Sequence, residues 1–123
     1  MQKTILVAED EPMILRIITF KLEMEGHRVL QAKTGPEVVE NLKQEKPDLL
    51  LLDATLPDMN SFEILQNIRS DYGLKNLPIF MLTQTHEPWQ AEKAMELGAT
   101  QCIVKPFKPT VLAKQVRNLF EST

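Results

Sequence analysis

The sequence has one cysteine, no long apolar run and no block of basic residues. The lone thiol, Cys102, cannot form an intramolecular disulfide, and no cysteine or histidine stands near it at zinc-site spacing. The longest aliphatic run, 49–52, is far short of the roughly 20 residues of a membrane helix, and the N-terminus lacks a signal-peptide pattern. The formal net charge is -3, so direct nucleic-acid binding is not expected. A reducing, cytoplasmic location fits these absences.

The order of the predicted elements indicates an α/β fold. A length of 123 residues suits one domain, and we expect residues 1–123 to form it. Five strand-like segments alternate with five helix-like ones, a pattern typical of a parallel sheet covered on both faces. The predicted strands are 5–8, 28–32, 48–53, 79–82 and 101–104. Right-handed crossovers with helices on both faces require one reversal of the winding, and the strand order 2-1-3-4-5 of a doubly wound sheet satisfies this requirement.

Helix starts are marked by cap residues and early prolines. Pro12, Pro88 and Pro109 fit first turns, Thr34 has capping-box spacing to Glu37, and Ser61 is a candidate N-cap. The first helix is expected to end at Gly26 and the fourth before Gly98. Inward-facing positions, in chain order, are expected at Ile14, Ile17, Ile18, Leu22, Val38, Val39, Leu42, Phe62, Ile64, Leu65, Ile68, Ala91, Ala94, Met95, Leu112, Val116, Leu119 and Phe120. The six methionines are expected to fill gaps in the core.

Four apolar runs end at polar residues. Glu9 and Asp10 follow the first run, Asp53 follows the third, and Thr83 and Lys105 follow the fourth and fifth. Since parallel strands share a carboxyl edge, where open α/β sheets bind ligands, these side chains should meet there. Three carboxylates held together without cysteine or histidine favour Mg²⁺. Taken singly, each residue also has a structural interpretation, such as a helix cap for Asp10 or a turn residue for Asp53.

The motifs around these positions resemble a known family. The segments Ile5-Leu6-Val7-Ala8-Glu9-Asp10-Glu11, Leu52-Asp53-Ala54-Thr55-Leu56-Pro57-Asp58-Met59, Leu82-Thr83 and Lys105-Pro106-Phe107 are similar to the four signatures of response-regulator receiver domains, the CheY-like superfamily of two-component signalling. The likeness spans essentially the whole chain. It implies the flavodoxin-like, CheY-like fold and a phosphorelay signalling role.

The resemblance also implies a role for each site residue. Asp53 would accept a phosphoryl group from a sensor histidine kinase, a histidine phosphotransfer protein or a small donor. Mg²⁺ would be held by Glu9, Asp10, Asp53 and the backbone carbonyl of Thr55, while Lys105 and Thr83 would bind phosphoryl oxygens. The protein would catalyse only its own phosphorylation and dephosphorylation. The resemblance further implies a cis Lys105–Pro106 bond, an isomer that is accessible before proline.

The output implied by the resemblance is a protein contact. Thr83 would draw the following loop toward the phosphoryl group and alter the face formed by the fourth helix, fifth strand and fifth helix. A downstream protein would bind there. A phosphorylation-dependent dimer is a further possible partner arrangement. Trp89 has two interpretations, core packing or partner contact, and is our candidate interface aromatic.

Four positions depart from the common receiver pattern. Glu9 replaces the commoner aspartate, and its extra methylene either reaches the metal directly or crowds it. Gln84 follows Thr83 where a small residue is usual, so we expect a slow phosphoryl cycle. Cys102 replaces the Tyr or Phe that changes rotamer on activation. Ser61 stands where glycine is frequent, which a capping role would accommodate.

Three alternative functions remain beside the phosphorylatable switch. Gln84 and Cys102 favour a phosphorylation-independent interaction module that keeps the fold. An aspartyl-nucleophile hydrolase is disfavoured because Thr55, two residues after Asp53, offers no general acid. A flavodoxin-like cofactor binder is disfavoured because the loop after the first strand holds acids where a phosphate cradle needs donors.

Overall fold

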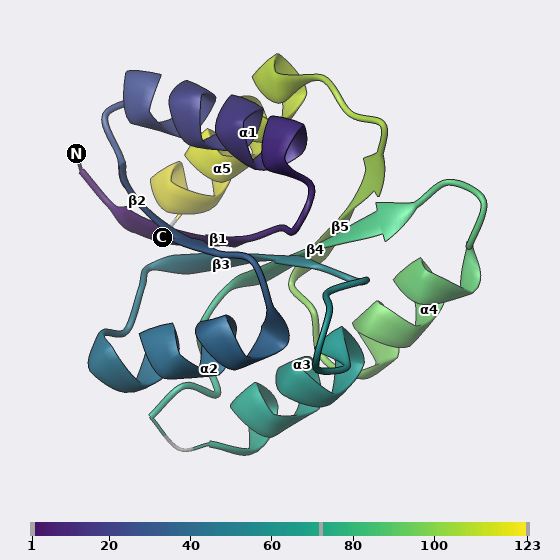
Figure 1. Ribbon diagram of the computed structural model, residues 1–123. Coiled ribbons are helices and arrows are strands. Elements are labelled where there is room, and N and C mark those ends of the chain that lie inside the picture. Colours follow the sequence, from purple (N-terminus) through teal and green to yellow (C-terminus); the bar gives the residue numbers. More distant parts are fainter. Residues whose placement is uncertain (1, 72, 123) are drawn as a thin grey trace.

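The computed structural model, described here for residues 2–71 and 73–122, is a parallel sheet between two layers of helices (Figure 1). Helices α1 and α5 cover one face, and α2, α3 and α4 cover the other. In chain order the elements are β1 (Thr4–Ala8), α1 (Pro12–Met24), β2 (Arg28–Ala32), α2 (Gly35–Gln44), β3 (Leu49–Asp53), α3 (Ser61–Ser70), β4 (Ile79–Gln84), α4 (Trp89–Glu96), β5 (Gln101–Lys105) and α5 (Pro109–Glu121). The strand order is β2-β1-β3-β4-β5, as predicted.

The sheet separates two apolar cores. In β3, Leu50 and Leu52 face the α2, α3 and α4 side, while Leu49 and Leu51 face the α1 and α5 side. All five residues of this strand are buried, which is expected of a central parallel strand with helices on both sides. The core therefore fixes β3, and with it the position of Asp53 at the strand's carboxyl end.

Side chains cap the first three helices. Glu11 accepts hydrogen bonds from the first-turn amides of α1, and Thr34 accepts one from Glu37 at the start of α2. The predicted cap of α3 is wrong by one residue, because Asn60 Oδ1 accepts from Phe62 and Glu63. Ser61 is instead the first helical residue and is buried.

Two of the predicted inward-facing positions are exposed. Ile17 and Met95 lie at the surface, each next to a buried residue, Ile18 and Ala94. Adjacent helical residues point about 100° apart, so a one-residue error moves a side chain out of the core. The interpretation of the methionines is also wrong: among the described residues Met81 is buried, whereas Met13, Met24, Met59 and Met95 are exposed.

One arginine ties together the end of the molecule where the strands begin. Arg69, in α3, donates from Nε to the carbonyl of Gly98 at 2.7 Å and from Nη1 to the carbonyl of Leu77 at 2.7 Å. A third bond, 3.1 Å long, reaches the carbonyl of Lys75. Gly98 has φ +103°, and a Cβ there would lie 3.1 Å from Arg69 Cγ, so both its conformation and this contact favour glycine. None of the helices in the described part of the chain is long and apolar enough to cross a membrane.

Candidate functional site

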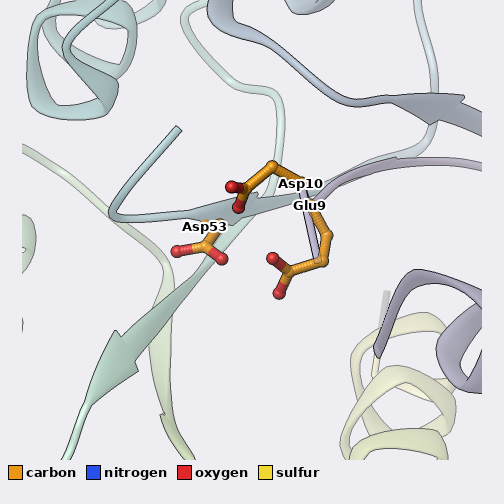
Figure 2. Close-up of side chains that lie close together, drawn as sticks. All are labelled: Glu9, Asp10 and Asp53. Carbon is orange, nitrogen blue, oxygen red and sulfur yellow. The ribbon is translucent and has the colours of Figure 1, made fainter. Parts of the chain in front are cut away.

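Three carboxylates converge where β1 and β3 end (Figure 2). Glu9 and Asp10 directly follow β1, and Asp53 is the last residue of the neighbouring β3, in which Leu52 pairs with Ala8. One oxygen from each carboxylate lies within 4.8 Å of the others. Glu9 and Asp53 are buried, whereas Asp10 is exposed. The predicted meeting of the three acids is therefore present in the structure.

Lys105 bridges the two buried acids. Its Nζ lies 2.5 Å from Glu9 Oε1 and 2.5 Å from Asp53 Oδ2. Burial opposes the charged ammonium, but the hydrogen bonds to Asp53 and Glu9 raise the pKa of Lys105 above its ordinary value. Lys105 is therefore a cation at neutral pH, held directly beside Asp53.

Glu9 has an unusual protonation equilibrium. Burial raises its pKa to about 8, and the hydrogen bond and negative charge of Asp53 act in the same direction, while Lys105 lowers it. Burial is therefore the main reason that the charged form of Glu9 is disfavoured, and an added cation would favour that form. The hard oxygen atoms of the three carboxylates fit a divalent ion such as Mg²⁺.

Thr83 contributes a buried hydroxyl group to the site. This residue lies in β4, which pairs with β3 so that Leu82 is opposite Asp53. Thr83 Oγ1 is buried and has no hydrogen-bond partner among the described residues. Because a buried hydroxyl without a partner costs free energy, an oxygen-rich ligand that reached it would be stabilised.

Thr55 contacts Asp53 through its amide. The Thr55 N–H donates to Asp53 Oδ1 at 2.9 Å. The Ser61 hydroxyl donates to the backbone carbonyl of Asp53 at 2.6 Å, a contact that sequence reasoning missed. Together they fix both the backbone and the side chain of Asp53.

The loop after β4 is anchored at two points, neither of which was predicted. The Gln84 N–H donates to Oε1 of the buried Gln90 at 2.8 Å. The Thr85 hydroxyl donates to the carbonyl of Lys105. The only sequence signal for Gln90 was its place one helical turn before Ala94, on the same inward face.

Above the carboxylates lies an open pocket of about 760 Å³, which collects residues from four loops. Its lining includes Asp53, Thr55, Gln84, Lys105 and Pro106. The Lys105–Pro106 bond is cis, as predicted. Cys102 lies outside this lining; it is half-buried, with Sγ 3.8 Å from the carbonyl of Ala91, and burial raises the pKa of its thiol.

Comparisons with known proteins identify the family of this chain. The family model of the response regulator receiver domain matches residues 5–117. The alkaline phosphatase synthesis transcriptional regulatory protein PhoP of Bacillus subtilis is 35% identical over 95% of this chain and 48% of its own length. The chain thus spans about half of that relative.

Solved structures show the same fold. The chemotaxis response regulator CheY4 of Vibrio cholerae has a TM-score of 0.89 and 28% identity, with 96% of this chain and 98% of that one covered. The signal receiver domain of a signal transduction histidine kinase from Syntrophus aciditrophicus has a TM-score of 0.90 and 29% identity, with 98% and 92% covered. The chain belongs to the response regulator receiver domain family, whose members are signalling modules.

Proposed function

We propose that this protein is a phosphoacceptor switch in which Asp53 receives the phosphoryl group. The observation that carries this proposal is the position of Asp53: a buried carboxylate at the floor of an open pocket, 2.5 Å from a lysine ammonium and beside two further acids. A carboxylate is a competent nucleophile for phosphoryl transfer when nearby charges are balanced.

In this proposal each neighbour of Asp53 has a task. Asp53 attacks the phosphorus of a phosphohistidine or a small phosphodonor, the bond from phosphorus to the donor breaks, and an acyl phosphate forms. Lys105 Nζ neutralises an equatorial phosphoryl oxygen. Glu9, Asp10, Asp53 and the Thr55 carbonyl would hold Mg²⁺, which would supply charge neutralisation for the remaining oxygens.

The switch we propose begins at Thr83. Its hydroxyl, which has no hydrogen-bond partner in the described part of the chain, binds the third phosphoryl oxygen, and this draws in the loop held by Gln90 and Thr85. A group with about two negative charges can bias two nearby conformations through a coupling of typically 1 to 3 kcal/mol.

The output surface in this proposal is the face of α4, β5 and α5. Trp89, at the start of α4, is 48% exposed, and its ring centroid lies 5.6 Å from that of Phe62. A half-exposed aromatic side chain is suited to protein contact. The donor would be a sensor histidine kinase or a histidine phosphotransfer protein, and we place the protein in the cytoplasm as a single receiver domain over residues 1–123.

A second candidate is a phosphorylation-independent interaction module. Gln84 in the pocket and Cys102 in place of an aromatic residue favour it. In that case the fold would present the same faces without a phosphoryl cycle.

Intact mass measurement separates the two candidates. The protein is incubated with Mg²⁺ and acetyl phosphate, and candidate kinases are tried in parallel. We expect the parent to gain one phosphoryl group, Asp53→Asn to gain none, and the parent in EDTA to gain none. Asp58→Asn, a change to an exposed acid in the loop after β3, should behave like the parent. No mass gain under any condition would favour the interaction module.

A further inference from the structure

Helix α1 presents a row of large apolar side chains to solvent. Met13, Ile17, Phe20 and Met24 are 59%, 42%, 64% and 65% exposed. Single exposed apolar residues are ordinary, but a continuous row along one helix marks an interaction surface. The proposed phosphoryl chemistry uses none of these four side chains.

The spacing within this row is that of helix-to-helix packing. The intervals of four, three and four residues are those of alternating d and a positions in a heptad, with Met13 and Phe20 at d and Ile17 and Met24 at a. Two helices that carry such a row pack side by side at about 20° with their side chains interdigitated. The row therefore fits another helix of the same kind.

Charged side chains beside the row favour one of the two ways, parallel or antiparallel, in which α1 of a second copy could pack against it. Arg16 and Glu23 occupy the flanking g positions, and neither has an ion-pair partner within residues 2–71 and 73–122. In a parallel pair, Arg16 would lie against Lys21 of the second copy, which is repulsive. In an antiparallel pair, Arg16 lies against Glu23 of the second copy, and symmetry repeats this contact.

We propose that α1 is a self-association surface on which two copies of this chain pair antiparallel about a two-fold axis. Ile17 then packs against Phe20 of the second copy on both sides of the axis, and Met13 packs against Met24 at both ends. On the Arg16 and Glu23 side, a groove of about 350 Å³ that is also lined by Lys33 receives the charged flank of the second helix.

The size of α1 sets the strength of the association. Its 13 residues extend about 20 Å, so α1 alone buries less than the roughly 800 Å² per partner of a standard interface. We therefore expect a weak dimer that depends on concentration, and this inference does not depend on whether Asp53 is phosphorylated.

Sedimentation equilibrium over roughly 10 µM to 1 mM tests the proposal. The parent should shift from monomer to dimer across this range. Phe20→Glu should remain monomeric, and Arg16→Glu should weaken association at least tenfold by placing two acids together. The double variant Arg16→Glu/Glu23→Arg should regain the affinity of the parent. Because these side chains are exposed, circular dichroism should show an unchanged fold.

Val111→Glu is the matched control, since Val111 is an exposed apolar residue on α5. It should dimerise like the parent. A parent that stays monomeric throughout, or a dimer that Val111→Glu disrupts and Phe20→Glu does not, would overturn the proposal. Failure of the charge-reversed double variant to recover would reject the antiparallel pairing. A monomeric parent in which Phe20→Glu blocks only phosphoryl transfer would assign the surface to the donor protein and likewise overturn it.

Discussion

At the scale of single residues, the site depends on charges that are held out of water. Lys105 shares its ammonium between Glu9 and Asp53, so one positive charge balances two buried acids. The third acid, Asp10, remains in contact with solvent. Burial raises the pKa of Glu9 to about 8, and the neighbouring Asp53 adds to this shift.

The protonation of Glu9 predicts a pH-dependent stability. Its pKa rises from 4.5 to about 8 on folding, so the folded protein binds this proton more tightly than the unfolded chain does. The resulting stabilisation is complete below about pH 4.5 and is lost as the pH rises through 8. In EDTA, we expect the melting temperature of the parent to fall more than that of Glu9→Gln over this interval.

Added Mg²⁺ should raise the melting temperature of the parent at pH 8, because the cation takes the place of the lost proton. Thermal melts of both proteins across this interval, with and without Mg²⁺, provide the measurement. Equal pH slopes for the two proteins in EDTA would contradict the assignment to Glu9.

Gln84 predicts a slow phosphoryl cycle. Its side chain narrows the pocket that leads to Asp53, whereas its backbone N–H makes the bond to Gln90. Gln84→Ala should therefore open the approach without releasing the loop, and raise both phosphorylation and hydrolysis by roughly tenfold or less. Time courses of intact mass measure both rates. Gln66→Ala, a change on the exposed side of α3, is the control. Identical rates in the parent and in Gln84→Ala would show that the Gln84 side chain does not slow the cycle.

At the scale of elements, two neighbouring residues at the start of α3 have different roles. Asn60 caps the helix, and Ser61 holds the end of β3. Asn60→Ala removes the cap and should lower the free energy of unfolding by about 1 kcal/mol. Ser61→Ala removes a buried hydroxyl from the Asp53 carbonyl, and we expect a loss of about 1 to 2 kcal/mol. Urea titration measures both, with Ser70→Ala at the exposed end of α3 as the control. A free energy of unfolding that is unchanged in Asn60→Ala would contradict the assignment of Asn60 as the cap.

The loop after β4 should become more mobile when its bond to Gln90 is removed. Gln90→Ala leaves the Gln84 N–H without its acceptor, while the tether from Thr85 to Lys105 remains. We expect the amide of Gln84 to exchange with deuterium at least tenfold faster, with little change in the exchange of β1 and β3 amides. Unaltered exchange at Gln84 would show that the loop is held by other contacts.

At the scale of the whole molecule, the sheet joins two apolar cores that should unfold in one cooperative transition. Leu50 and Leu51 are adjacent in β3 but belong to opposite cores. Each Leu→Ala variant should cost about 2 to 5 kcal/mol. Circular dichroism and the fluorescence of Trp89, the single tryptophan, should report the same urea midpoint in each variant. Separate midpoints would mean that the two faces unfold independently.

Sequence periodicity was sufficient for the architecture because apolar strand-like runs alternate with helical patterns and each helix has a start signal. It was insufficient for the helix faces: Ile17 and Ile18 are equally apolar, and the sequence does not say which one points inward. At the site, the convergence of Glu9, Asp10, Asp53 and Lys105 followed from strand order. The roles of Ser61 and Gln90 did not, because they depend on burial and side-chain direction, which ordinary polar residues do not reveal in a sequence.

The Arg69 contacts connect α3 to the segments that precede β4 and β5. Its guanidinium joins the segment before β4 to the carbonyl of Gly98 after α4, at the end of the sheet opposite the carboxylates. A displacement that starts at Thr83 therefore meets an α4 that is held at both ends, through Gln90 to β4 at its start and through Gly98 to Arg69 after its last residue. Arg69, itself fixed by three bonds, holds the Gly98 end and one side-chain bond holds the start, so we expect Trp89 to move farther than Gly98 when the site is phosphorylated.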